Sequence, residues 1–148
     1  MNAPQGILLA AALLGPGSPA LQERPVTVAP DDPSIRWSPC PPVFAAGCEL
    51  AVLQGDPAQP NADLVLRVPA GFALPAHTHT SAERMILLSG RLTVKYLGTP
   101  ETTLAAGSYA HGPAGAPHRA TCVGDETCVL FIAFEAPVDA MPYAGALD

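Results

Sequence analysis

The stretch GFALPAHTHTSAERMILLSG, residues 71–90, contains two of the four histidines of the chain. His77 and His79 are two residues apart, a spacing that puts both side chains on one face of a β-strand but on nearly opposite sides of a helix. Glu83 has the same parity and joins that face if the strand pattern continues through residues 80–82. Two imidazoles and a carboxylate on one face form a ligand set for a divalent metal ion. A surface His-Thr-His with a solvated glutamate is the alternative that spacing alone leaves open.

A second stretch, GSYAHGPAGAPHRATC at residues 107–122, contains the other two histidines. The first stretch follows the spacing G, five residues, H, one, H, three, E, six, G, and the second follows G, five, P, one, G, two, H. These spacings resemble the two motifs of the cupin superfamily at every fixed position. Glycine makes up only about 7% and proline about 5% of an average chain, so a chance match at so many ordered positions is remote.

The resemblance implies both a fold and a metal site. The implied fold is an all-β cupin barrel, also called a double-stranded β-helix or jelly roll, which frequently forms homodimers. The implied cofactor is one divalent metal ion, with Fe, Mn, Ni, Cu and Zn all remaining candidates, and its implied ligands are His77, His79, Glu83 and His118. A looser similarity over residues 37–143 is to small bacterial cupins that often carry export signals.

Glycine and proline divide the chain from residue 64 onward into short apolar runs. About eight strands are expected, at residues 64–68, 74–79, 83–88, 91–97, 103–104, 108–111, 116–122 and 127–134. No run in this region shows the i, i+3, i+4 recurrence of an amphipathic helix, so the pattern predicts an all-β protein. Turns that need positive φ or close chain approach are expected at Gly71, Gly90, Gly107 and Gly115.

Strand parity also predicts which neighbours of the ligands line the pocket. The expected lining residues are Met85, Leu87 and Ala120. Arg84 and Arg119 have the opposite parity and should point out of the barrel, which argues against either of them as a substrate clamp.

Three further side chains are candidates for hydrogen bonds that orient a ligand imidazole: Tyr96, Tyr109 and His111. Ordinary strand packing is the alternative for all three, and we favour it. Cys122 stands where many cupins have asparagine and shares strand parity with His118, so a thiol facing the pocket near the metal is a further alternative.

We divide the chain into a candidate signal peptide at residues 1–20, edge strands that wrap the barrel at residues 21–50, and the cupin barrel with its C-terminal tail at residues 51–148. The apolar run at residues 7–14 is far shorter than the roughly 20 residues that span a bilayer, so no membrane span is expected. The run has the length of a signal-peptide core, but no Lys or Arg precedes Arg24, and a plain apolar tail is the alternative.

Within the proline-rich part before the barrel, residues 26–29 and 49–53 are candidate edge strands, because proline is tolerated where no ladder donor is required.

The four cysteines form two pairs that are local in sequence, and we predict the disulfides Cys40 to Cys48 and Cys122 to Cys128. Disulfides persist in oxidising compartments, so the pairs favour a periplasmic or secreted protein. Buried free thiols in a cytoplasmic protein are the alternative.

The length and net charge of the chain limit the number of domains and the types of binding partner. A length of 148 residues fits one domain. The net charge of −6, with seven Lys and Arg that do not cluster, offers no surface for a phosphate backbone, so no nucleic acid is expected as a partner. The expected partner is a small molecule.

The site predicts a small metalloenzyme, a dioxygenase, isomerase or decarboxylase-like catalyst that acts on a small oxygenated molecule at the metal. Catalytic residues beyond the metal ligands are unknown, since no second carboxylate or lysine stands out as a general base. A non-catalytic module that binds a small ligand or metal is the alternative, and a structural barrel with a vestigial site is the third reading.

Overall fold

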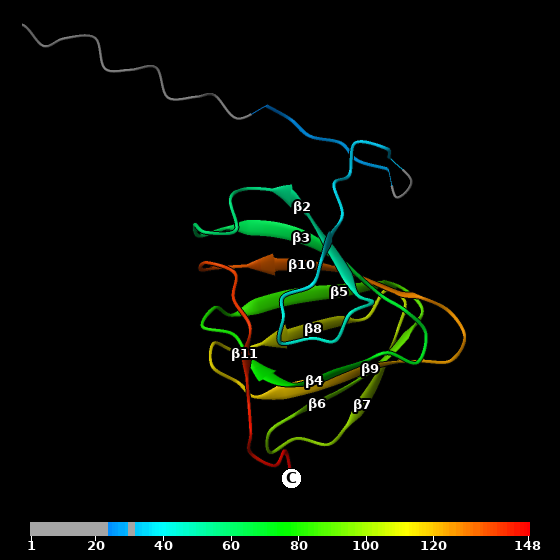
Figure 1. Ribbon diagram of the computed structural model, residues 1–148, viewed down its shortest axis with the longest axis vertical. Coiled ribbons are helices and arrows are strands. Elements are labelled where there is room, and N and C mark those ends of the chain that lie inside the picture. The colour runs from blue at the N-terminus through cyan, green and yellow to red at the C-terminus, as the bar shows by residue number, and fades with distance from the viewer. Residues whose placement is uncertain (1–23, 30–31) are drawn as a thin grey trace, which may run out of the picture.

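The computed structural model describes residues 24–29 and 32–148 (Figure 1). The candidate signal peptide lies outside the described residues. Within them the chain forms eleven strands and no helix: β1 (Ser38–Pro39), β2 (Glu49–Gln54), β3 (Ala62–Val68), β4 (Ala73–Thr78), β5 (Glu83–Ser89), β6 (Arg91–Tyr96), β7 (Thr102–Ala105), β8 (Tyr109–Gly112), β9 (His118–Val123), β10 (Cys128–Phe134) and β11 (Met141–Pro142). None of the described segments is a helix able to cross a membrane.

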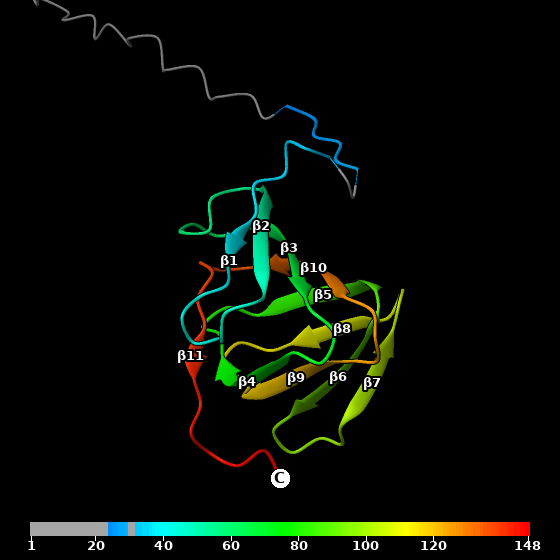
Figure 2. The ribbon, with the colours of Figure 1, turned by 45° about the vertical axis from the view of Figure 1, so that its right-hand side comes forward.

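The strands form two antiparallel sheets that face each other as a jelly roll (Figures 1 and 2). The larger sheet has the order β1-β2-β3-β10-β5-β8, and the smaller has the order β11-β4-β9-β6-β7. Neighbours in the sheets are mostly distant in sequence, as where β10 lies between β3 and β5. The all-β fold expected from the sequence is confirmed.

All eight strands expected after residue 64 are present, and so is the edge strand expected at residues 49–53, which is β2. The edge strand expected at residues 26–29 is wrong, because these residues have no strand conformation. Their place at the edge is taken by β1, which pairs with β2 through Ser38 and Leu50. Residues 26–29 are all exposed, so no side chain there is buried against the barrel to stabilise a strand.

Burial alternates along the strands, as expected for sheets that pack on one face. In β10, the residues Cys128, Leu130, Ile132 and Phe134 are buried and the residues between them are not. Fully burying a side chain such as that of Leu130 stabilises the fold by about 2 kcal/mol, so this face holds β10 and its sheet against the core.

The four turn glycines expected from the motifs all have positive φ, at Gly71, Gly90, Gly107 and Gly115. Gly90, between β5 and β6, is the most constrained. A Cβ atom there would lie 2.8 Å from the carbonyl oxygen of Thr127 and 2.9 Å from Cα of Cys128. Only glycine therefore allows β10 to approach this turn.

Both predicted disulfides are present. Cys40 and Cys48 are bonded with a Cα separation of 5.6 Å, and Cys122 and Cys128 with one of 5.8 Å, both within the usual range. The second bond joins β9 of the smaller sheet to β10 of the larger one. The alternative of a Cys122 thiol facing the pocket is wrong, because this sulfur is bonded and fully buried.

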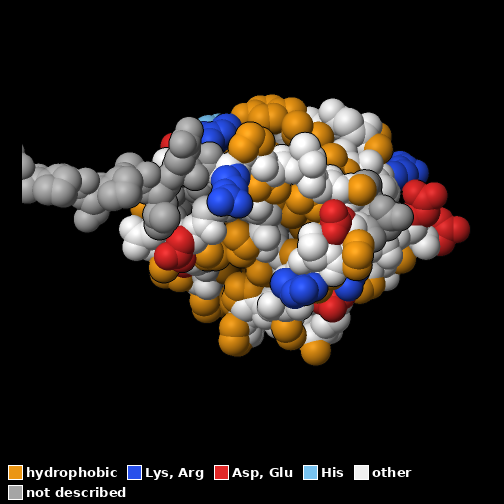
Figure 3. Space-filling model, turned by 90° about the horizontal axis from the view of Figure 1, so that it is seen from above, with side chains coloured by type: hydrophobic (Ala, Val, Ile, Leu, Met, Phe, Trp, Pro, Cys, Tyr) orange, Lys and Arg blue, Asp and Glu red, His pale blue; other side chains and the backbone are white. Residues whose placement is uncertain are grey.

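On the face seen in Figure 3, basic side chains stand singly among acidic and apolar ones. Two arginines of the barrel wall form ion pairs with glutamates. Arg84 contacts Glu135, and Arg119 lies 3.3 Å from Glu101, with all four side chains about half exposed. Both arginines therefore point out of the barrel, as their parity predicts.

Candidate metal centre

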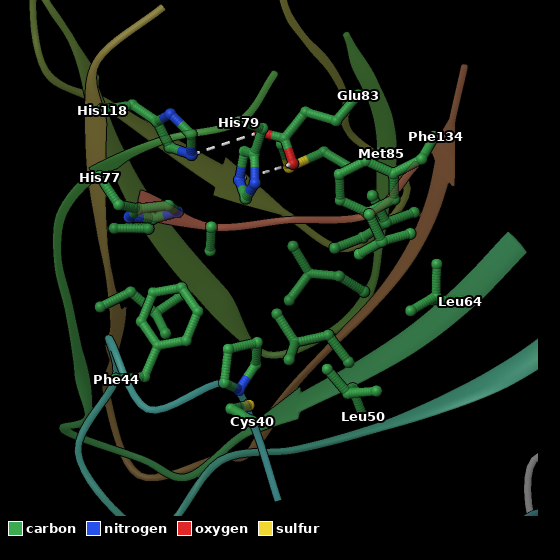
Figure 4. Close-up of a pocket in the computed structure, with 18 of the residues that line it drawn as sticks. Cys40, Phe44, Leu50, Leu64, His77, His79, Glu83, Met85, His118 and Phe134 are labelled. Carbon is green, nitrogen blue, oxygen red and sulfur yellow. Dashed lines mark ion pairs between the residues drawn. The ribbon is translucent and has the colours of Figure 1, made fainter. Parts of the chain in front are cut away.

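Three histidines meet at one end of the barrel interior. His77 lies near the end of β4, His79 just after it, and His118 at the start of β9. Because β4 and β9 are antiparallel neighbours, His77 is directly opposite His118. The ligand nitrogens of the three side chains all lie within 4.8 Å of one another, and each residue is less than a tenth exposed. Figure 4 shows the three rings turned toward a common point.

The backbone fixes which nitrogen of each ring faces that point. Nδ1 of His77 lies 2.6 Å from the carbonyl oxygen of Pro75, and Nδ1 of His118 lies 3.0 Å from that of Ala116. A carbonyl oxygen only accepts, so Nδ1 must carry the proton in both rings. In the neutral ring, Nε2 then has a free lone pair, which is the form that binds a metal ion.

His79 is oriented in the same way, but from a distant part of the chain. Its Nδ1 donates to the backbone carbonyl of Asp139, which follows β10. The carboxylate of Asp139 in turn accepts hydrogen bonds from the amide and the hydroxyl of Thr80, at 2.8 and 2.6 Å. Sequence reasoning missed Asp139, because a contact across 60 residues leaves no local pattern.

A buried serine ties the turn between the ligands to the same segment. The hydroxyl of Ser81 accepts hydrogen bonds from the amides of Glu135 and Ala136, at 3.0 and 2.9 Å, and donates to the carbonyl of Ala82. The turn that separates His79 from Glu83 is therefore held in place by the chain after β10. This role was also missed from the sequence.

Glu83 begins β5 and directs its carboxylate at two of the imidazoles. Oε1 lies 3.3 Å from Nε2 of His118, and Oε2 lies 3.5 Å from Nε2 of His79. With Nδ1 protonated, both Nε2 atoms are acceptors, and the carboxylate oxygens are acceptors as well. Oε1 has no hydrogen-bond partner among the described residues. Acceptors that face acceptors in a buried site need a cation or a bridging hydrogen-bond donor between them.

Protonation of His77 or His118 is a poor source of positive charge at this site. Burial, aided by charge on His118, lowers the pKa of His77 from 6.5 to about 3. Burial also lowers the pKa of His118, although the Glu83 carboxylate acts in the opposite direction. Both rings are thus held neutral near pH 7, and the donor set fits a divalent cation.

Of the three candidates for orienting hydrogen bonds, only Tyr96 lies at this site. Its ring is 5.0 Å from that of His118, and its buried hydroxyl has no hydrogen-bond partner among the described residues. A Cβ atom on Gly112 would lie 2.9 Å from Oε1 of Glu83 and 3.1 Å from the Tyr96 hydroxyl. The carboxylate and the phenol therefore flank the same glycine. Burial and the charge of Glu83 raise the pKa of Tyr96, which keeps the phenol protonated.

Tyr109 and His111 occupy the other face of the sheet. Tyr109 is 60% exposed, and His111 is exposed beside Arg84 of β5. Both side chains therefore face away from the ligand imidazoles, which agrees with the strand packing favoured for them from the sequence. Parity makes residues 109 and 111 share a face, and β8 turns that face to the surface.

A cavity of about 80 Å³ adjoins the histidines and Glu83 (Figure 4). Met85 and Ala120 line it, as parity predicts. Leu87 points inward but does not line the cavity, because it is fully buried further along β5. Phe44, whose ring stands edge-on to His77 at 4.8 Å, and residues 138–140 also line the cavity.

Comparisons with known proteins agree with this architecture. Residues 64–134 match the family model described as a cupin domain. The DMSP lyase DddQ from Ruegeria pomeroyi DSS-3 is similar in structure, with a TM-score of 0.64 and 21% sequence identity over 76% of this chain and 64% of that chain.

A variant of the oxalate decarboxylase of Bacillus subtilis has a TM-score of 0.56 and 16% identity over 66% of this chain and 28% of that chain. The cupin domain of Cnp3 from Schizosaccharomyces pombe has a TM-score of 0.55 and 19% identity over 60% of this chain and 61% of that chain. The chain thus spans less than two thirds of each of these proteins, and no curated protein sequence matches it. The family model shows that residues 64–134 form a cupin domain, and both motifs lie within that span.

Proposed function

We propose that the chain binds one divalent metal ion through His77, His79 and His118, with Glu83 as the fourth ligand. The observation that carries the proposal is the set of acceptors that face one another: Nε2 atoms made acceptors by the carbonyls at Nδ1, and a buried carboxylate 3.3 and 3.5 Å from two of them. A divalent cation bound among these acceptors would satisfy all of them.

The metal would serve a small oxygenated molecule, either as a Lewis acid for its oxygen atoms or as a redox centre. The chain's own residues would hold the metal, exclude bulk water and keep the imidazoles neutral. The proposed reaction is of the dioxygenase, isomerase or decarboxylase-like kind. The neighbours named as an oxalate decarboxylase and a DMSP lyase support a reaction of a small molecule and, of these three kinds, the decarboxylase-like one.

A non-catalytic ligand-binding or metal-binding module is the second candidate, and one observation favours it. Apart from the four ligand residues, Asp139 is the only titratable side chain among the described residues that line the cavity, and its carboxylate accepts hydrogen bonds from Thr80. The cavity therefore offers no free general base or acid in the described residues, so a reaction there would depend on the metal alone.

The test is the metal content of protein purified without an affinity tag, measured by elemental analysis. His118→Ala should lose most of the metal, and His111→Ala, which removes an exposed histidine, should keep it. Equal metal in wild type and His118→Ala would reject the assignment of His118. Turnover by loaded wild type on small hydroxy or oxo acids then separates an enzyme from a binding module.

We propose in addition that the protein works in an oxidising compartment, periplasmic or extracellular, and the two disulfides support this. A homodimer is the proposed assembly. Supporting it, Ile86 and Tyr109 are paired in register on the outer face of β5 and β8 and are 40% and 60% exposed, beside Leu88 at 53%. Light scattering that gives the mass of one chain would reject the dimer.

A further inference from the structure

The cavity beside the metal site continues into the barrel between the two sheets. Its inner wall consists of aliphatic side chains from strands of both sheets: Leu64, Leu74, Leu92, Leu130 and Ile132. All five are buried. In Figure 4 the histidines and Glu83 lie at one side of the space, and Leu50 and Leu64 lie at the other. A ligand held at the histidines would thus direct the rest of its body into an apolar chamber.

The chamber wall offers a ligand no positive side chain in the part of the chain that the structure describes. Neither lysine nor arginine is among the described residues that line it. The two arginines nearest in sequence to the ligands, Arg84 and Arg119, point outward and pair with Glu135 and Glu101. A second carboxylate at the far end of the ligand would be desolvated among aliphatic side chains without a partner.

We propose that the natural ligand is neutral or singly charged, with oxygen donors at one end and a short aliphatic chain at the other, and that the site rejects dicarboxylates of the same length. The inference rests on the proposed metal site, because the metal would hold the oxygen donors. The apolar chamber supplies the selectivity, since burial of each methylene is favourable and burial of an unpaired charge is not.

The test uses 2-hydroxy acids, in which the end that reaches the metal is constant and the other end varies. Binding of glycolate, 2-hydroxybutanoate and 2-hydroxyhexanoate to the metal-loaded protein is measured by calorimetry. Each added methylene should tighten binding by about fourfold until the chamber is full. 2-Hydroxyadipate is the matched dianion, with a carboxylate in place of the terminal methyl group, and it should bind at least about tenfold more weakly than 2-hydroxyhexanoate.

The outcomes separate this inference from the metal proposal. If the protein holds metal and binds glycolate, but affinity is flat with chain length or 2-hydroxyadipate binds as well as 2-hydroxyhexanoate, the inference is wrong and the metal site stands. If the protein holds no metal, the metal proposal fails and the inference fails with it. If metal is present and no hydroxy acid binds, the inference alone is overturned.

Two variants probe the chamber itself. Ala120→Leu adds volume at a lining position, and the gain in affinity with chain length should disappear. Ala133→Leu adds the same volume on the outer face of β10 and should keep the gain. If Ala120→Leu does not fold, Leu130→Ala enlarges the chamber instead, and the longest acid that still gains affinity should become longer. An unchanged dependence on chain length in the folded lining variant contradicts the inference.

Discussion

The two ends of the barrel interior differ although they share the same strand faces. Along β5, inward residues run from Glu83 at the metal centre through Met85 at the cavity to Leu87 in the closed core. Along β9, the sequence runs from His118 through Ala120 to Cys122 in the disulfide.

In both strands the polar ligand is at one end, the lining residue is two positions on, and the fully buried residue is two further on. Parity says that a residue faces the barrel interior, but its position along the strand determines whether it is a ligand, a cavity-lining residue or a fully buried core residue. We call the end with Leu87 and Cys122 the closed end and the end with Glu83 and His118 the open end. Tight packing at the closed end holds the sheets together, so the open end can contain buried polar atoms.

The comparison predicts that the open end depends on metal for its stability. A ligand that binds only the native state at a thousandfold excess over Kd raises the free energy of unfolding by about 4 kcal/mol. Chelation of the loaded protein should thus lower the melting temperature by roughly 10 °C. Thermal unfolding with and without chelator measures this. An identical melting temperature in both conditions would show that the histidines hold no metal.

The closed end should instead depend on packing. Leu87→Ala removes a side chain that is fully buried, and should lower the free energy of unfolding by about 3 kcal/mol, with metal affinity unchanged once folded. Denaturant unfolding measures this loss. Leu88→Ala is the matched control, because Leu88 is 53% exposed and its loss should have an effect below about 0.5 kcal/mol. A large loss of metal affinity in Leu87→Ala would mean that the two ends are not separate.

Acid should destabilise the metal-free protein through the open end. The pKa of His77 is about 3 in the folded chain and about 6.5 when unfolded, so between these values the unfolded state binds more protons. Stability is full above pH 6.5 and falls as the pH drops toward 3, by about 1.4 kcal/mol per unit for one such group.

His118, whose pKa is also lowered, adds to this slope. Unfolding free energies measured from pH 7 to pH 4 test it. His77→Gln should flatten the dependence, and exposed His111→Gln should leave it as in wild type. If His77→Gln retains the full slope, burial of this imidazole is not its source.

The smallest effect concerns Tyr96, which we propose donates a hydrogen bond to Glu83 when the metal is bound. Tyr96→Phe should weaken metal binding by about tenfold, because such partners orient a ligand carboxylate. Stability without metal should change little, since the hydroxyl has no partner among the described residues. Metal titration by calorimetry measures the change, and Tyr109→Phe on the outer face is the control. Equal affinities in wild type and Tyr96→Phe would assign Tyr96 to packing alone.

Much of the fold followed from local pattern, since strand alternation has a period of two and turn glycines need positive φ wherever they occur. The same reasoning placed His77, His79 and Glu83 on one face, and the motif spacing added His118. Both disulfides were also correct, because each closes a short segment of chain.

The tertiary structure determined three features that the period-two pattern of the strands does not specify: which face of a strand is outward, how deeply a residue is buried, and which distant residues form hydrogen bonds. Parity states that Tyr109 and His111 share a face but not which face, and that choice depends on how β8 docks on β5. Parity also placed Leu87 on the inner face of β5, but it could not say how deeply the side chain is buried, because that depends on how closely the two sheets pack at that point. The carbonyl of Asp139 reached His79 only because the chain after β10 returns to the open end. Period is a property of neighbouring residues, whereas depth, face and distant hydrogen bonds are set by the packing of one sheet against the other.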